Sequence, residues 1–506
     1  MDLTVKVFNG VFGAVGISFF TGCMPATDSP APQPNILWIY LDDARADGIG
    51  CYGGQWANTP NIDRLAGEGV MFSQAIIQNP VCVPSRKSMK TGYYAYEAGP
   101  VAMGRSPEVE GDYIDHSRMQ LINESPNLLD AWTGIGMKPL NIGKVHAFHD
   151  HFDLRGDPPR LFNVFGNPTD YFKANFGEDS EILNAERVFT RTHGWQIGGV
   201  LDIEPEATET WRLGDLALDM VDELAGKDEP FFLRVSFHAP HVACYVPREY
   251  YVDPSLIDLP LPDEDELAGK PEFEKGPLKI YAEADLTREQ IDLVRGTYFG
   301  MMDLVDVQVG RILRALEESG LLDNTIIAFT SDQGFQLGER GLWKKRVFYE
   351  ENVLVPFILR YPETLPRGLR IDEQVEMIDF LPTLMEMSGL HVPEEIRGAS
   401  LLPLISGEVT TWREACFSEI DHSQSMYEEL RQGTGRRVMV RTRDWKMVFF
   451  MDNRVEDKDG ALYNLVNDPG EKVNLYNLPE YADVIGYLEN LAGEWTNGRN
   501  FAPGKN

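Results

Sequence analysis

The sequence predicts an α/β protein with a large, mostly parallel sheet flanked by helices and a small antiparallel-sheet subdomain at the C-terminal end. Three observations predict this fold class. Short apolar runs without alternation recur up to about residue 330, which is typical of strands buried on both faces. Segments with helical periodicity lie between these runs. Beyond residue 404, short strand-like runs separated by turns replace this pattern.

Each predicted strand of the large sheet ends in polar residues. The strands are expected over residues 35–41, 139–142, 230–237 and 325–330. The polar groups that follow them are Asp42-Asp43, Gly143-Lys144-Val145-His146, His238-Ala239-Pro240-His241 and Ser331-Asp332-Gln333-Gly334. Because open α/β sheets bind ligands at the carboxyl ends of their strands, these groups are the first candidates for a functional site.

The clearest predicted helix begins at Thr287, where Gln290 completes a capping box, and it ends near Gly320. Further helices are expected over 58–68 and 378–387.

The C-terminal subdomain is predicted from strand-like runs at 438–440, 445–450 and 461–465 and from a closing helix over 481–495. We place the main domain at 35–405 and the subdomain at 406–506.

The first segment predicts export. Lys6 precedes an apolar stretch over 7–20 that is too short to span a bilayer comfortably. The stretch leads into Thr-Gly-Cys at Cys23 and resembles a bacterial lipoprotein signal. We therefore expect a signal peptide over 1–23, a lipid anchor at Cys23 and a linker over 24–34, in a periplasmic or cell-surface protein. Ordinary secretion with cleavage a few residues later is the alternative.

Composition limits the partners. The chain has 506 residues, with 46 Lys and Arg against 79 Asp and Glu, and a formal net charge of −33. A surface this acidic excludes a general affinity for nucleic acid. The five cysteines have neither zinc-site spacing nor the density of a disulfide framework. At least one of them is therefore expected to have another role.

The most specific motif is Cys82-Val83-Pro84-Ser85-Arg86, followed by Lys90-Thr91-Gly92. It resembles the signature of the type I sulfatases of the alkaline phosphatase superfamily, in which Cys-x-Pro-Ser-Arg directs oxidation of the Cys to formylglycine. Other stretches resemble blocks of this family in the family's order: 35–43, 58–65, 143–146, 236–241, 331–345, 378–383, 462–465 and 467–472. The resemblance implies an alkaline-phosphatase-like fold and is greatest to iduronate-2-sulfatase-like carbohydrate sulfatases.

A metal site is predicted next to this motif. Asp42, Asp43, Asp332 and Gln333 follow two different strands and offer hard oxygen ligands, which suit Ca²⁺ or Mg²⁺ and not zinc. The resemblance favours one Ca²⁺ and adds Cys82, as formylglycine, to its ligands. The family commonly has Asn or His where Gln333 stands. Paired aspartates after a strand also form turns and helix caps, so Asp42 and Asp43 alone would not indicate a metal.

The resemblance also implies the roles of the remaining site residues. Arg86 and Lys144 would hold the oxygens of formylglycine and sulfate, and Lys345 would contact sulfate. His241 would protonate the leaving alcohol. His146 would take a proton from the second hydroxyl of the formylglycine hydrate, which expels sulfate. Imidazole suits both histidine roles because its pKa is near neutral.

Several assignments have alternatives. Lys344 is adjacent to Lys345, and His238 is an alternative to His241. Arg45 either binds a carboxylate or lies on the surface. Further candidates for substrate subsites are His149, His151, His193 and Trp195.

Together these features predict a sulfuric ester hydrolase acting on a sulfated uronic acid or another sugar of a glycosaminoglycan or of an algal polysaccharide such as ulvan. Its expected partner in maturation is the enzyme that generates formylglycine. One alternative is a phosphonate or phosphodiester hydrolase of the same superfamily. Another is a non-catalytic glycan-binding lipoprotein, in which Cys82 would remain a thiol.

Overall fold

The computed structural model describes residues 33–98, 127–144, 153–154, 186–189, 196–261, 269–271, 273–274, 286–421, 435–451, 460–499 and 501. The predicted signal peptide, with Cys23, and most of the linker lie outside these residues. Among the helices of the described part, none is both long enough and apolar enough to cross a membrane.

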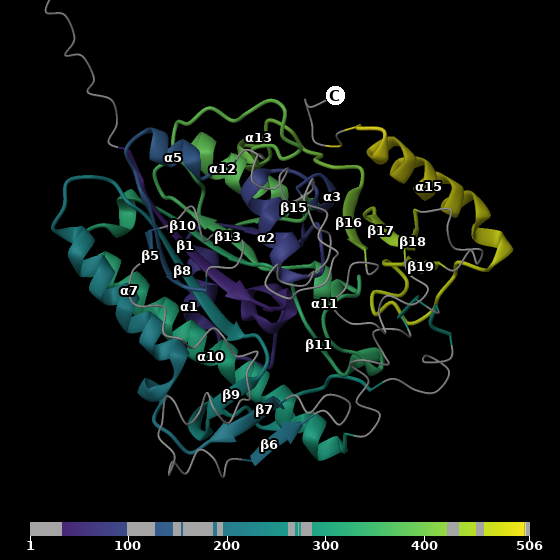
Figure 1. Ribbon diagram of the computed structural model, residues 1–506, viewed down its shortest axis with the longest axis horizontal. Helices are drawn as coiled ribbons and strands as arrows, with labels where there is room; N and C mark the ends of the chain where they lie inside the picture. The colour runs from purple at the N-terminus through teal and green to yellow at the C-terminus, as the bar shows by residue number, and fades with distance from the viewer. Residues whose placement is uncertain are drawn as a thin grey trace, which may run out of the picture. The chain divides into compact units, whose positions relative to one another are not determined.

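The main sheet contains all four predicted strands (Figure 1). They are β1 (Asn35–Asp42), β4 (Pro139–Gly143), β8 (Phe232–Pro240) and β10 (Thr325–Ser331). The sheet also contains β2 (Val70–Phe72), β5 (Asp153–Leu154), β13 (Phe357–Arg360) and β14 (Leu369–Ile371), in the order β14-β2-β13-β10-β1-β8-β4-β5. Only the β13 pairings with β10 and β2 are antiparallel among the pairings of the described strands in this sheet. The prediction of a mostly parallel sheet is therefore confirmed.

Helices cover both faces of this sheet. They are α1 (Pro60–Gly67), α2 (Cys82–Thr91), α5 (Asp130–Gly134), α7 (Glu209–Ala225), α10 (Arg288–Glu318) and α12 (Phe380–Met387). Three shorter helices are α3 (Ala95–Ala98), α11 (Glu350–Val353) and α13 (Leu402–Ile405). The predicted capping box of Thr287 and Gln290 is present at the start of α10. The sequence analysis did not predict α7, which lies beside α10 (Figure 1).

Strand β1 divides the core into two layers. Trp38 and Tyr40 belong to an apolar cluster with residues of α2, α5 and α12. Leu37 and Ile39 point to the other face and belong to a cluster with residues of α1, α7 and α10. Successive side chains of a strand alternate between faces, so a continuous apolar run is what a strand between two helical layers requires.

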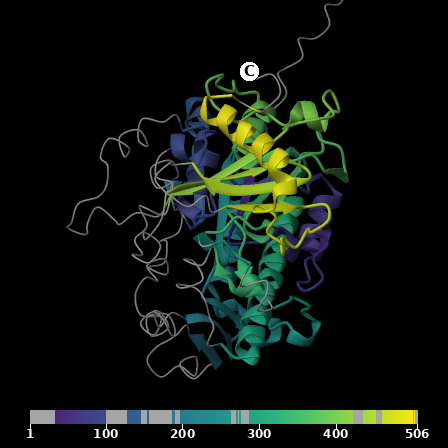
Figure 2. The ribbon, with the colours of Figure 1, turned by 90° about the vertical axis from the view of Figure 1, so that its right-hand side faces the viewer.

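A separate antiparallel sheet forms the C-terminal part, as predicted. Its strands are β16 (Cys416–Asp421), β17 (Arg436–Arg441), β18 (Trp445–Phe450) and β19 (Ala461–Asn464). Helix α15 (Ala482–Thr496) covers one face of this sheet (Figure 2). Trp495 of this helix stacks on Phe417 of β16. On the other face, Met439 and Val448 belong to the same apolar cluster as Trp38 of β1. The domain boundary at 405–406 stays a prediction.

Three small sheets complete the description. The first pairs β6 (Glu186–Phe189), β7 (Gln196–Leu201) and β9 (Cys244–Pro247). The second pairs β11 (Gln336–Leu337) with β12 (Trp343–Lys344), and the third pairs β3 (Ala75–Ile76) with β15 (Val375–Glu376).

Candidate active site

Three carboxylates meet at the carboxyl ends of β1 and β10. These strands are parallel and in register, with Leu41 opposite Ser331, so the residues that follow them meet at one edge of the sheet. Asp42, Asp43 and Asp332 are fully buried, and ligand oxygens of all three lie within 4.8 Å of one another. Asp43 has a left-handed backbone, with φ of 65°. This turn is held by hydrogen bonds from its N–H to Asp332 Oδ1 (3.1 Å) and from Tyr298 Oη to its carbonyl (2.7 Å).

The cluster fits a hard divalent cation. Burial and the charge of Asp332 raise the pKa of Asp43, partly offset by Lys345, as expected for carboxylates confined together. Within the described part, Asp43 Oδ2 and Gln333 Oε1 are buried and accept no hydrogen bond. Gln333 Nε2 lies 3.4 Å from Asp42 Oδ1 and also contacts Asp43, so a half-turn of this amide would add an oxygen to the donor set. The expected ligand groups of the two strands thus lie together.

Cys82 is the first residue of α2 and is 2 % exposed. The helix is tied to the carboxylates, because Ser85 Oγ donates to the Asp332 carbonyl (2.6 Å) and Arg86 Nε donates to Asp332 Oδ2 (2.7 Å). The Arg86 guanidinium also stacks over the Tyr40 ring at 4.4 Å. Burial raises the pKa of the Cys82 thiol, although Lys345 opposes this. An unmodified Cys82 would therefore be a protonated thiol and a poor nucleophile at neutral pH.

Two lysines face the same carboxylates. Lys144 follows β4 and its Nζ contacts Asp42, while Lys345 Nζ lies 2.7 Å from Asp43 Oδ1. Burial and the charge of Lys345 lower the pKa of Lys144 to about 7. Arg86 and Lys345 thus bring positive charge to the site, and Lys144 adds a basic side chain whose pKa is close to neutral in the free protein.

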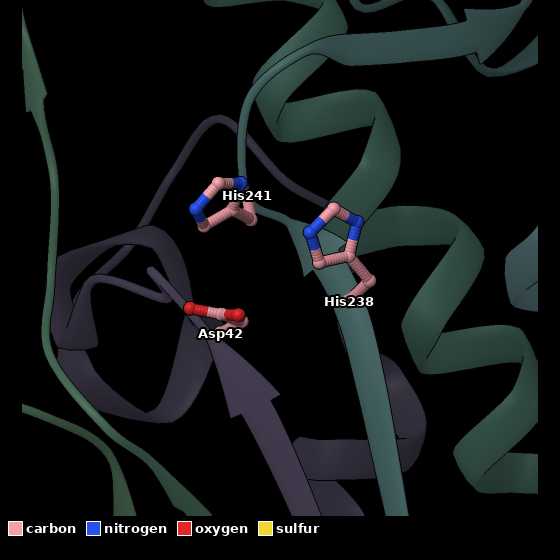
Figure 3. A group of neighbouring side chains, drawn as sticks. All are labelled: Asp42, His238 and His241. Atoms are coloured by element: carbon pink, nitrogen blue, oxygen red, sulfur yellow. The ribbon is translucent and has the colours of Figure 1, made fainter. Parts of the chain in front are cut away.

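Strand β8 supplies two histidines: His238 lies within the strand, and His241 follows it directly. Figure 3 shows His238 and His241 on the same side of Asp42, and their rings stack at a centroid distance of 4.7 Å. His241 Nε2 lies 3.7 Å from Asp43 Oδ2. Burial, and then Lys144 and Lys345, lower the pKa of both histidines. Both rings are therefore neutral at pH 7 before an anion binds.

Comparison with known proteins identifies the family. A family model described as sulfatase matches residues 34–390. The chain belongs to the sulfatase family. It is therefore a sulfuric ester hydrolase, as the motifs predicted. A second model, described as the C-terminal part of N-sulphoglucosamine sulphohydrolase, matches residues 338–496 of this sulfatase.

Named relatives cover most of the chain. The N-acetylglucosamine-6-O-sulfatase of Bacteroides thetaiotaomicron is 27% identical over 93% of this sulfatase and 88% of its own length. Human iduronate 2-sulfatase is 28% identical over 74% of this sulfatase and 72% of its own length.

Solved structures share the fold. A phosphonate monoester hydrolase from Silicibacter pomeroyi has a TM-score of 0.76 at 24% identity and covers 92% of this sulfatase and 96% of that chain. A protein described as BT4656, in complex with its substrate D-glucosamine-2-N,6-O-disulfate, has a TM-score of 0.63 at 22% identity and covers 92% of this sulfatase and 99% of that chain.

Of the predicted site residues, His146 lies outside the described part of the sulfatase, and so do His149, His151, His193 and Trp195. The remaining predicted catalytic and metal-ligating residues lie at the carboxylate cluster: Asp42, Asp43, Cys82, Arg86, Lys144, His241, Asp332, Gln333 and Lys345. Of the two adjacent lysines, Lys345 is the one whose Nζ contacts Asp43, whereas Lys344 is a residue of β12.

Of the two expectations for Arg45, binding of a carboxylate is confirmed and a surface position is wrong. It is 1 % exposed and pairs with protein carboxylates, at 2.6 Å from Asp47 and 2.5 Å from Glu339. Arg45 therefore ties the turn after β1 to the segment after β11. Tyr298 and Glu339 support this turn and were not predicted as site residues. Each is an ordinary helix or loop residue in the sequence, and only the fold gives it this contact.

Proposed function

We propose that this sulfatase removes sulfate esters from a carbohydrate, with Cys82 oxidised to formylglycine and one Ca²⁺ bound by Asp42, Asp43, Asp332 and Gln333. The observation that carries the proposal is the position of Cys82. It begins α2 beside three buried carboxylates and three basic side chains. A formylglycine hydrate at this position supplies a hydroxyl nucleophile, and the cation lowers the pKa of that hydroxyl.

Arg86, Lys144 and Lys345 are suited to bind the sulfuryl group. A sulfate ester surrounds its sulfur with negative oxygens, so attack on it needs fixed positive charge. All three side chains are held before substrate binds, by Asp332, Asp42 and Asp43 respectively. Preorganised donors of this kind stabilise developing charge without having to reorganise during the reaction.

His241 is our candidate for protonating the leaving alcohol, with His238 as the alternative. A bound sulfate ester would offset the charges of Lys144 and Lys345, which lower the pKa of His241 in the free protein. The pKa would then rise towards the range in which imidazolium is an effective acid. For His146, proton transfer in the release of sulfate remains our proposal from its motif position.

The names of the relatives support a carbohydrate substrate. Two relatives are named for sulfatase activity on N-acetylglucosamine and on iduronate, and one solved neighbour holds a disulfated glucosamine. We propose a sulfated uronic acid or another sugar of a glycosaminoglycan or of an algal polysaccharide such as ulvan. We further propose that the protein is exported, anchored through a lipid at Cys23, and matured by a formylglycine-generating enzyme.

Two paired measurements test this function. Protein is produced together with a maturation enzyme, and mass spectrometry of the peptide containing Cys82 reports formylglycine. Sulfate release is then measured on defined sulfated oligosaccharides, with Cys82→Ala as control. We expect formylglycine at position 82, and sulfate release that the control lacks.

The same preparations test the rival activities. Phosphonate monoester and phosphodiester substrates are assayed beside the sulfated sugars over a range of pH. Faster turnover of a phosphonate or phosphodiester than of any sulfated sugar would replace the proposal with that activity. A Cys82 thiol in an inactive protein would favour the glycan-binding lipoprotein, and a thiol in an active enzyme would contradict the mechanism.

A further inference from the structure

The segment that carries Lys345 has an unusual backbone. Within residues 336–352, here called the Lys345 loop, Arg340, Lys344 and Arg346 have positive φ angles of 56°, 71° and 85°. A left-handed backbone is unfavourable for a residue with a side chain, because Cβ then comes too close to the following carbonyl oxygen. Two of these residues flank Lys345 directly, so the direction of its side chain depends on a conformation that the loop would not adopt alone.

Hydrogen bonds within the loop hold part of this conformation. Asn352 Nδ2 donates to the Lys344 carbonyl (3.2 Å), and Gln336 Nε2 donates to Asn352 Oδ1 (2.7 Å). Arg340 donates twice to Glu351, at 3.0 and 3.1 Å. These bonds connect the beginning of the loop with its end, where Glu350 and Glu351 begin α11.

The C-terminal sheet holds that end. Arg441 of β17 donates to both oxygens of Glu350, at 3.0 and 2.8 Å. Lys446 of β18 places Nζ 2.6 Å from Glu350 and 2.7 Å from Glu471, and it donates to the Phe348 carbonyl (2.9 Å). Glu471 in turn accepts from the Glu350 backbone N–H (2.8 Å). We call this set the clamp network: Arg340, Glu350, Glu351, Arg441, Lys446 and Glu471.

The clamp network is buried and balanced in charge. The side chains of Lys446 and Glu471 are fully buried, and none of the six side chains is more than 19% exposed. A buried ion pair is weak evidence of added stability, because desolvation offsets most of the attraction. A buried ion pair fixes geometry instead, because moving one partner away leaves the other charge buried and unpaired. Such a network therefore fixes where the Lys345 loop sits.

We propose that the clamp network positions Lys345, so that the C-terminal sheet sets the distance between Lys345 Nζ and Asp43. Lys446 and Arg441 are then positioning residues that act through Glu350. The inference rests on the proposed role of Lys345 in binding sulfate. It also explains the stretch 467–472, which the sequence singled out without a function: this turn supplies Glu471 and the Gly470 carbonyl, which accepts from Arg340 at 2.5 Å.

The test uses full-length, matured enzyme and the variant Lys446→Met. Glu351→Gln is a milder second variant, because it keeps its shape and removes one charge from Arg340. The matched control is Arg360→Met. Arg360 is another buried cation, 2 % exposed and paired with Glu68 and Asp323, but it lies on β13 away from the loop.

Three measurements are made. The first is amide hydrogen exchange over 336–352. The second is kcat and KM for a sulfated sugar, per folded molecule. The third is a double-mutant cycle with Lys345→Ala, which separates loss through Lys345 from general destabilisation.

We expect exchange in the loop to rise at least about 10-fold in Lys446→Met and not in the control. We expect kcat to fall about 10- to 100-fold with KM changed less than about threefold, because a misplaced charge is felt most in the transition state. Adding Lys446→Met to Lys345→Ala should then lower kcat by no more than about twofold. Glu351→Gln should give smaller changes in the same directions.

Two results would overturn the inference. Unchanged exchange in the loop would show that the network does not anchor it, whether or not the protein is active. Full additivity of the two substitutions would show that the loss does not pass through Lys345. If wild-type enzyme hydrolyses no sulfate ester, the proposed function fails and with it the role of Lys345. The exchange result would then still decide whether the loop is anchored.

Discussion

Two buried clusters of charge in this sulfatase have similar composition and opposite character. The first, here called the site cluster, consists of Asp42, Asp43, Arg86, Lys144, Asp332 and Lys345. The second is the clamp network of Arg340, Glu350, Glu351, Arg441, Lys446 and Glu471. Each combines three carboxylates with three basic side chains. Only their geometry differs.

In the clamp network, both oxygens of Glu350 and of Glu351 accept hydrogen bonds from arginine, and Glu471 Oε1 lies 2.7 Å from Lys446 Nζ. In the site cluster, Asp43 Oδ2 accepts none from the described residues, and the carboxylates crowd within 4.8 Å of one another. A cluster that is complete by itself can only hold structure. A cluster left incomplete is free to bind a cation and a substrate, at some loss of stability.

The largest expected effect is that of Asp43→Asn, which should lower activity strongly and stability only slightly. We expect kcat/KM to fall by at least about 10³-fold, because a cation ligand is lost. The free energy of unfolding without metal should fall by less than about 1 kcal/mol, because a carboxylate that burial and Asp332 already destabilise is removed. Kinetics and urea unfolding in chelator measure both. Asp323→Asn, at an exposed position, is the control.

A larger loss of stability is expected in the clamp network. Glu350→Gln leaves Lys446 and Arg441 short of one buried negative charge, so the free energy of unfolding should fall by about 3 kcal/mol. Urea unfolding at neutral pH measures this loss. An unchanged midpoint and slope would mean that the network contributes no more than the site cluster does, and the contrast would be lost.

The sequence predicts the site cluster much better than the clamp network. Asp42, Asp332 and Lys144 follow apolar runs that the sequence marks as strands. The carboxyl ends of parallel strands lie at one edge of the sheet, so a local pattern is enough to bring these residues together. Cys82 and Arg86 lie in one short motif. In contrast, Glu350 and Lys446 are almost a hundred positions apart and look like ordinary charged residues. Their pairing depends on how the small sheet packs against the main sheet, which no local pattern encodes.

The same reasoning explains the errors in the fold. The continuous apolar strands and the capping box at Thr287 were predicted because their signals are local. Strands β2, β13 and β14 have only three or four residues, too few for a reliable pattern. Arg45 binds carboxylates, but its partner Glu339 is distant in the chain, so the sequence did not indicate which carboxylate it binds.

The next largest expected effect is that of Ca²⁺ on stability, which should depend on the site cluster and not on the clamp network. We expect Ca²⁺ at about 100 times its dissociation constant to raise the free energy of unfolding of the wild-type protein by about 2.7 kcal/mol. The Glu350→Gln variant should gain the same amount, because its site cluster is intact, whereas Asp43→Asn should gain little. Thermal unfolding across a Ca²⁺ titration measures these shifts. Equal gains in all three proteins would place the cation elsewhere.

Acid should affect the clamp network in a defined range of pH. Burial would raise the pKa of Glu351, but Arg340 and Arg45 outweigh it and lower the pKa from 4.5 to about 2. Because the folded-state pKa is the lower one, the stabilisation is present above pH 4.5 and is lost as pH falls towards 2. It is on the order of 3 kcal/mol at neutral pH, because each unit of pKa difference corresponds to about 1.4 kcal/mol. Unfolding free energies between pH 2 and 6 should depend less steeply on pH in Glu351→Gln than in the wild-type protein.

The smallest expected effect is that of salt on activity. Salt should screen the exposed charges around the site and have little effect on the buried site cluster itself. The net charge of −33 would repel a long sulfated chain, and salt screens exposed charges over about 8 Å at physiological ionic strength. We expect kcat/KM on a sulfated polysaccharide to rise about two- to fivefold between about 0.02 and 0.2 M NaCl, with little change on a sulfated monosaccharide. The stability difference between Glu350→Gln and the wild-type protein should not change, because buried pairs are screened much less. A flat or falling response on the polysaccharide would mean that the acidic surface does not limit the access of long sulfated chains to the site.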